Sequence, residues 1–202
     1  MNPPPPSTAQ PLVGVLALQG DFEAHERALE RLGASVREVR TVGDLDGIDG
    51  LVIPGGESTT MTLGVQREGL GEPIATLVGD GLPVLGSCAG LIMLDRAHLG
   101  LMDIRARRNA FGRQINSFEV DLDVAGLRGG AVRAVFIRAP WIAEHGEDVE
   151  ILAAVDGHPV AAREGRILAV AFHSEIAEDD RLHEMLLDWA RSFSAERRAG
   201  RV

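Results

Sequence analysis

Short apolar runs alternate with amphipathic segments along the first half of the chain. The runs have the length of strands buried on both faces, and they lie within residues 13–18, 36–39, 48–56 and 82–87. Between the first two, QGDFEAHERALERLG carries apolar residues at helical spacing and stops at Gly33. Further helices are predicted in the stretch through Leu77 and in AGLIMLDRA. This alternation is typical of an α/β fold with a parallel sheet covered by helices.

The second half of the chain has a different pattern. Strand-like segments separated by Gly, Asp or Pro turns predict an added antiparallel or mixed portion, at residues 118–122, 132–137, 149–155, 160–163 and 167–172. Leu182, Met185, Leu186, Trp189 and Phe193 then form one apolar face of a closing helix that is expected to pack on the sheet.

Length and composition indicate one globular domain. The chain has 202 residues, of which 45% are hydrophobic, and its longest apolar run is far shorter than the ~20 residues of a membrane-spanning helix. We expect a disordered Pro-rich tail at residues 1–11, a single domain at 12–194 and a flexible tail at 195–202. The N-terminus has no secretory pattern and the only cysteine cannot form an internal disulfide, so a soluble, cytoplasmic protein without membrane contacts is expected.

The net charge of -10 argues against a nucleic-acid surface, since phosphate binding needs a basic face. Arg105, Arg107, Arg108 and Arg113 form a local exception. They are typical either of a solvated strand edge or of a contact with an anionic small molecule or a subunit.

The single cysteine lies in VLGSCAGLI, between a predicted strand and a predicted helix. Gly86-Ser87-Cys88-Ala89-Gly90 has the G-x-nucleophile-x-G form of a strained turn that exposes a nucleophile, with the Ala89 amide positioned to hold an oxyanion. The alternative is a buried structural cysteine. A nucleophilic reading therefore needs a base elsewhere in the chain.

His173 and Glu175 meet that need best. They lie two residues apart just after a predicted strand, where an extended backbone directs both side chains to one side, although such a pair can also be incidental. The five other histidines are expected on the surface or on helix faces: His25, His98, His145, His158 and His183. No motif has metal-ligand spacing, so neither a metal nor a cofactor is expected.

A glycine pair ends the third predicted strand in PGGESTT. It lacks the Lys of a phosphate-binding loop, but the backbone of Gly56 could complete an oxyanion hole with Ala89. Capping of the next helix by Ser58 or Thr59 is equally compatible with the sequence.

Taken together, PGGES, GSCAG and FHSE resemble the class I, triad-type glutamine amidotransferases. LALQGDFEAHERAL, RRNAFGRQINSFEVDL, VFIRAPWI and FHSEIAEDDRLHEMLLDW extend the resemblance to the glutaminase subunits of pyridoxal 5'-phosphate synthases, from Val13 to about Phe193. The resemblance implies a three-layer α/β/α sandwich with a mostly parallel central sheet, flavodoxin-like in type.

The resemblance also implies an activity. The chain would hydrolyse L-glutamine through a cysteine thioester and deliver ammonia to a (β/α)8-barrel synthase subunit in a large hetero-oligomer that makes vitamin B6. Cys88, His173 and Glu175 match the family's nucleophile, base and orienting carboxylate. Its glutamine-contacting positions match Gly56, Glu57, Ser58, Arg108, Ile137 and Arg138.

Two departures from the family pattern are visible. Ser174 stands where the family usually has proline, which removes a restraint on the His-Glu segment, and Ser87 stands where it usually has threonine. Two other functions stay open: a glutaminase for a different synthase, which RRNAFGRQ argues against, and a non-catalytic subunit, which the joint retention of Cys88, His173 and Glu175 argues against.

Overall fold

The computed structural model describes residues 10–108 and 117–201. Its central sheet has seven strands in the order β2-β1-β3-β4-β11-β10-β9. Neighbouring strands from β2 to β11 are parallel, whereas β10 pairs antiparallel with both β11 and β9. The strands of this sheet are β1 (Leu12–Leu16), β2 (Ser35–Val39), β3 (Gly50–Ile53), β4 (Val84–Ser87), β9 (Glu150–Val155), β10 (His158–Glu164) and β11 (Ile167–Val170).

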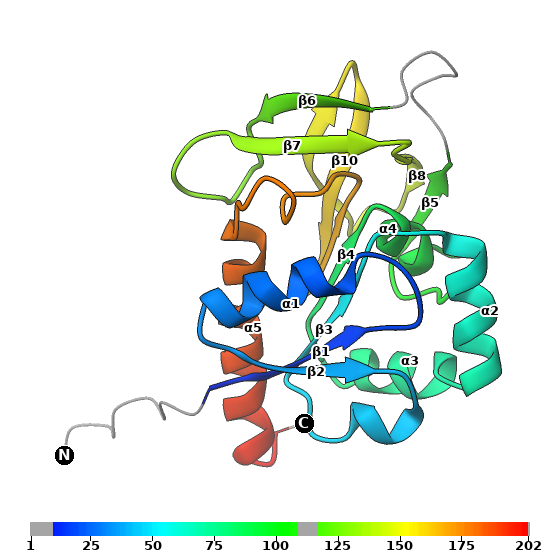
Figure 1. The fold of residues 1–202 in the computed structure, drawn as a ribbon, viewed down its shortest axis with the longest axis vertical. Helices are drawn as coiled ribbons and strands as arrows, with labels where there is room; N and C mark the ends of the chain where they lie inside the picture. The colour runs from blue at the N-terminus through cyan, green and yellow to red at the C-terminus, as the bar shows by residue number, and fades with distance from the viewer. Residues whose placement is uncertain (1–9, 109–116, 202) are drawn as a thin grey trace.

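Helices cover both faces of the sheet (Figure 1). One face carries α1 (Phe22–Arg31) and α5 (Arg181–Arg198); the other carries α2 (Ser58–Glu68), α3 (Gly71–Gly79) and α4 (Ala89–Leu94). A short 3-10 helix, η1 (Val42–Leu45), connects β2 to β3. The predicted three-layer α/β/α sandwich is confirmed.

Central strands are apolar because both of their faces are covered. Every residue of β3, β4 and β11 is buried, which explains why the sequence shows these strands as continuous apolar runs and not as alternating ones. The helical stretch predicted through Leu77 is two helices, because Gly69 adopts a left-handed φ of 67° and ends α2.

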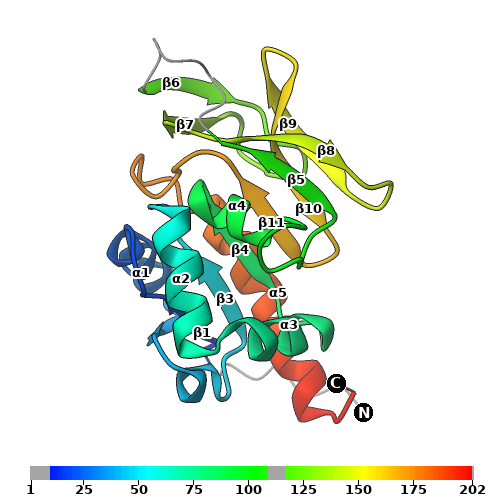
Figure 2. The ribbon, with the colours of Figure 1, turned by 90° about the vertical axis from the view of Figure 1, so that its right-hand side faces the viewer.

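Two small antiparallel sheets lie above the carboxyl edge of the parallel strands (Figures 1 and 2). One pairs β6 (Ser117–Leu122) with β7 (Val132–Ile137), and the other pairs β5 (Ile104–Arg107) with β8 (Trp141–His145). The pattern did not predict β5 and β8, because the charged residues of β5 and the exposed end of β8 give no continuous apolar run. Both small sheets overhang the edge at which β3, β4 and β11 end.

Helix α5 runs to Arg198, past residue 195, where the sequence predicts that a flexible tail begins. Arg197 holds the extra turn in place, because its guanidinium donates to the backbone of Gly47 and Ile48 and to Asp49. The predicted N-terminal tail falls almost entirely outside the described residues, as does Arg113.

Candidate active site

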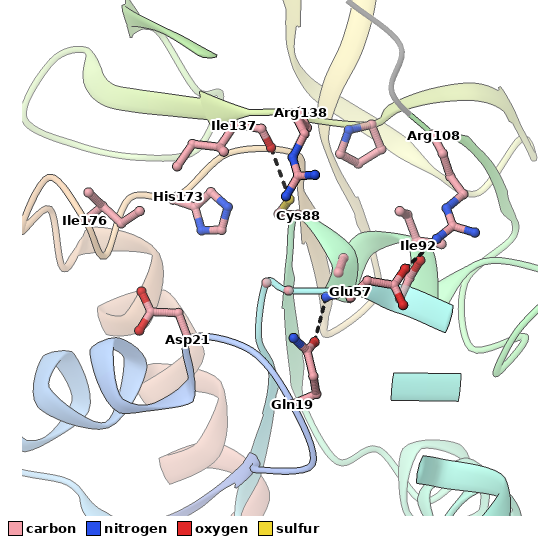
Figure 3. Close-up of a pocket in the computed structure, with 15 residues that line it drawn as sticks. Gln19, Asp21, Glu57, Cys88, Ile92, Arg108, Ile137, Arg138, His173 and Ile176 are labelled. Carbon is pink, nitrogen blue, oxygen red and sulfur yellow. Dashed lines mark hydrogen bonds and ion pairs between the residues drawn. The ribbon is translucent and has the colours of Figure 1, made fainter. Parts of the chain in front are cut away.

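A pocket of about 440 Å³ opens at the carboxyl edge of the parallel strands, beneath the small sheets (Figure 3). Nine of the residues predicted for the site line it: Gly56, Glu57, Ser58, Cys88, Ala89, Arg108, Ile137, Arg138 and His173. Residues that are distant in the chain meet here because β3, β4 and β11 are neighbours and all end at this edge. Glu175 does not line the pocket, but its carboxylate contacts Nδ1 of His173.

Cys88 occupies a sharp turn between β4 and α4. Its φ of 49° and ψ of -102° are unusual for a residue with a side chain and cost on the order of 1–3 kcal/mol. Its amide donates to the Val170 carbonyl at 2.8 Å, which ties the turn to β11. The thiol sulfur lies 4.0 Å from the carbonyl oxygen of Ile137 across the pocket.

Glycines on either side make this turn possible. A Cβ on Gly86 would lie 2.8 Å from the Gly90 carbonyl oxygen, and one on Gly90 would collide with the carbonyl of Ile53. The strand-turn-helix geometry that the sequence predicted around Cys88 is therefore present, and it depends on residues without side chains.

His173 and Glu175 form a buried pair. Nδ1 of His173 lies 2.6 Å from Oε1 of Glu175, and the backbone amide of His173 donates to Val135 of β7 at 2.9 Å. Burial alone lowers the pKa of His173, but hydrogen bonds and charge from Cys88 and Glu175 raise it to about 10. Burial raises the pKa of Glu175, but its contacts with His25 and His173 hold it below its usual range. The geometry suits an imidazolium beside the thiol.

Glu57 and Arg108 form one wall of the pocket. Glu57 caps α2 by accepting from the Thr60 and Thr59 amides, and these backbone hydrogen bonds hold its pKa at about 2. Arg108 reaches the same carboxylate at 3.1 Å and also donates to the Thr59 hydroxyl. Ser58 does not cap this helix, and its buried hydroxyl oxygen has no hydrogen-bond partner in the described part of the chain.

The opposite wall comes from the turn after β7. Ile137 and Arg138 lie there, with Arg138 at a left-handed φ of 45°, and Figure 3 shows both side chains above Cys88. Gly56 lies in the turn between β3 and α2 with a φ of 146°, a conformation that favours glycine, and a Cβ there would approach the backbone of Gly20 to 2.7 Å.

Sequence reasoning missed several pocket residues, among them Gln19, Asp21 and Ile176. Gln19 accepts from the Glu57 amide at 2.6 Å through its Oε1, so it holds the glycine turn. Its position three residues after the end of β1 was a usable signal, because ligands in such sheets bind outside the carboxyl ends of the strands.

Two of the remaining histidines, His25 and His183, lie on helix faces, which is one of the two placements expected. Their faces point inward, however, so both side chains are fully buried against the interior sides of α1 and α5. Their rings contact each other at 2.9 Å, from His25 Nδ1 to His183 Nε2. Helical spacing in the sequence placed both on a helix but gave no sign of a partner 158 residues away.

Residues 10–108 and 117–201 hold no candidate metal cluster and no candidate membrane-spanning helix. No three His, Cys, Asp or Glu side chains there are grouped to hold a metal ion. No helix in the same residues is long and apolar enough to cross a membrane.

Known proteins similar to this chain agree on one family. Residues 15–191 match the SNO glutamine amidotransferase family. "Pyridoxal 5'-phosphate synthase subunit PdxT" from Mycobacteroides abscessus is 51% identical over 191 residues, which cover 90% of this chain and 98% of that protein. The protein of the same name from Frankia alni is 50% identical over 196 residues, covering 93% and 98%.

Two solved structures share the fold of this chain. A crystal structure of a glutamine amidotransferase has a TM-score of 0.83 at 45% identity, and the match covers 88% of this chain and 98% of that one. The structure titled PurLQS from Thermotoga maritima shares the fold alone, with a TM-score of 0.74 at 19% identity and coverage of 90% and 99%.

Proposed function

The chain belongs to the SNO glutamine amidotransferase family, and from this premise we propose that Cys88, His173 and Glu175 are its catalytic residues. The chain is a glutaminase: it hydrolyses L-glutamine to L-glutamate and ammonia, and it supplies the ammonia to the synthase with which it makes pyridoxal 5'-phosphate. One observation supports the site assignment most strongly. The thiol of Cys88, on a strained turn, lies beside the imidazole of His173, whose Nδ1 is 2.6 Å from Oε1 of Glu175.

The reaction begins with the Cys88 thiolate, whose sulfur bonds to the side-chain carbonyl carbon of glutamine. As the carbon-nitrogen bond of the tetrahedral intermediate breaks, the imidazolium of His173 gives its proton to the departing nitrogen. Ammonia is released, and the substrate remains bound to Cys88 as a thioester. The neutral imidazole then takes a proton from water, whose oxygen attacks the thioester. Cleavage of the carbon-sulfur bond releases glutamate and restores the thiolate.

Glu175 acts throughout by orienting His173. The carboxylate accepts the Nδ1 hydrogen, which leaves Nε2 free to exchange protons with the thiol, the leaving group and water. Its low pKa keeps it ionised, so it stabilises the imidazolium without accepting the proton itself.

Backbone amides complete the site in this proposal. Ala89 and Gly56 donate to the oxyanion of the tetrahedral intermediate, which develops next to the Cys88 turn. Glu57, Ser58, Arg108, Ile137 and Arg138 line the pocket and contact the rest of the glutamine. An amino acid with two charged groups needs donors for its carboxylate and an acceptor for its ammonium group, which arginine, peptide amides and Glu57 provide.

The partner is the synthase subunit, which we propose to be a (β/α)8 barrel assembled with this chain into a large hetero-oligomer in the cytoplasm. Ammonia has to pass directly to that subunit, because in bulk water at neutral pH it is protonated and loses its nucleophilicity. The relatives named for the same synthase favour this partner over a synthase of another pathway.

Glutamine hydrolysis measured with and without the synthase subunit tests the proposal. We expect ammonia release by the complex. Cys88→Ala should abolish it, because removal of a hydrolase nucleophile costs on the order of 10⁶-fold in kcat. Replacing the exposed Glu147 with Gln is the matched control and should leave the rate unchanged. Hydrolysis that persists in Cys88→Ala contradicts the assignment.

A further inference from the structure

A buried polar cluster lies next to the triad and does not line the pocket. His25 comes from α1, His183 from α5 and Ser87 from the last position of β4. The two histidines have no solvent exposure and Ser87 has 1%. Buried polar side chains are normally hydrogen-bonded, so the partners of these three residues indicate their role.

His25 connects the cluster to the triad. Its Nε2 lies 2.9 Å from the Ser87 hydroxyl and 3.3 Å from Oε1 of Glu175, the same oxygen that accepts from His173 at 2.6 Å. Its Nδ1 lies 2.9 Å from Nε2 of His183. Two histidine rings from distant parts of the chain therefore converge on one carboxylate oxygen.

These contacts fit one arrangement of the ring hydrogens. An ionised carboxylate only accepts, so Nε2 of His25 donates if it bonds Glu175, and Nδ1 of the neutral ring then accepts from His183. The remaining nitrogen of His183, Nδ1, is then bare, and it is one of the buried atoms without a partner in the described residues. A charged His25 would instead leave an N–H of His183 without an acceptor, which is the costlier arrangement.

The surroundings of His183 favour its neutral form. Burial, together with the neighbouring His25, lowers the pKa of His183 to about 3. The groups that face His25 are His183 from α5, Ser87 from β4 and Glu175 from the segment after β11. An ion pair between Arg31, the last residue of α1, and Asp180, the N-cap of α5, also joins the two helices, at 2.7 Å.

We propose that His25 is a positioning residue of the glutaminase reaction, which donates from Nε2 to Glu175 and is itself held by His183 and Ser87. The second oxygen of Glu175 has no partner in the described part of the chain, so the donors on Oε1 alone fix the carboxylate. Without His25 the carboxylate can rotate or take up a proton, and His173 then loses the partner that sets its tautomer and direction.

The proposal rests on the proposed function and is tested in the complex of the full chain with the synthase subunit. His25→Leu removes the donor and keeps an apolar side chain of similar bulk, while His25→Gln returns an N–H near the position of Nε2. His145→Leu, which replaces an exposed histidine of β8, is the control. Circular dichroism and thermal unfolding establish that each variant is folded.

We expect kcat of His25→Leu to fall by roughly 10- to 100-fold, the cost of a misplaced catalytic group, while KM for glutamine changes little. The rate of Cys88 alkylation by iodoacetamide should begin to rise at a higher pH in His25→Leu than in the wild type. The reason is that a less firmly held Glu175 stabilises the imidazolium of His173 less. His25→Gln should recover much of kcat, and His145→Leu should match the wild type in both readouts. A folded His25→Leu with wild-type kcat and alkylation profile overturns the proposal.

A measurement on the unaltered chain decides the point even if His25→Leu does not fold. Nitrogen-15 NMR of histidine-labelled protein at neutral pH should find His25 as the Nε2–H tautomer. The Nδ1–H tautomer would overturn the proposal, because that ring cannot donate to Glu175. An inactive wild-type complex would instead refute the proposed function, so the two failures are distinguishable.

Discussion

Adding one methyl group at Gly55 should displace the catalytic base. Gly55 lies two residues after the end of β3, beside the imidazole of His173. A Cβ built on Gly55 lies 3.2 Å from Nδ1 and 3.3 Å from Nε2 of that ring, and closer still to Cε1 between them. Ordinary contact needs about 3.5–4 Å, so the ring would have to move by ~1 Å. The ring is buried and held by Glu175, so this movement separates it from Cys88 or from Glu175.

A displacement of that size costs on the order of 10²-fold in rate, or about 2.7 kcal/mol in activation free energy. The backbone of Gly55 does not need a positive φ, so Gly55→Ala should fold. The assay is kcat for glutamine hydrolysis in the complex, with Gly43→Ala as control because a Cβ there meets no atom within 4 Å. A folded Gly55→Ala with the wild-type rate would refute the arrangement described here.

Other substitutions test the turn, the buried pair and the surface. Gly90→Ala places a methyl group against the Ile53 carbonyl, and chemical denaturation should show a loss of ~1–3 kcal/mol in stability, whereas an unchanged midpoint contradicts the close packing of α4 on β3. The pKa of His173 is raised to about 10, so its pairing with Glu175 stabilises the fold fully below pH 6.5, and this stabilisation is lost as the pH rises toward 10. Glu175→Gln should reduce the change in the free energy of unfolding between these two pH values, measured in urea. An unchanged pH dependence counts against the pair. Arg166→Ala, which breaks a partly exposed pair with Glu196, should cost no more than about 1 kcal/mol by the same method, and a larger loss would show that solvent screens this pair less than we assume.

The sequence predicts the parallel core and the nucleophile turn because both depend on local patterns. Strands buried on two faces are continuous apolar runs, and the turn at Cys88 needs glycines at fixed positions next to it. His173 and Glu175 could be found for the same reason, since they lie two residues apart.

The cluster around His25 could not be predicted from local pattern, because it depends on how two helices from opposite ends of the chain pack. A histidine on an amphipathic helix looks the same whether its ring meets water or another ring. Only the packing of α1 against α5 gives His25 a partner in His183 and brings it to Glu175. The pairing of β5 with β8 was missed for a similar reason, since neither strand is apolar throughout.

The family departures also have different structural contexts. Ser87 uses its hydroxyl to contact His25 at 2.9 Å, a role that the threonine usual in the family could also perform. Ser174 is buried between His173 and Glu175, which contact each other without a proline between them. The serine at this position is therefore compatible with the His-Glu pair.

Labelling of Cys88 tests the central claim most directly. Cys88 is the only cysteine of the chain, so a glutamine-like electrophile incubated with the assembled complex can be located on it by peptide mass spectrometry. We predict one adduct on Cys88, its suppression by excess glutamine, and loss of glutamine hydrolysis in proportion to labelling. An unlabelled Cys88 in an active complex, or full activity after complete labelling, would contradict the account.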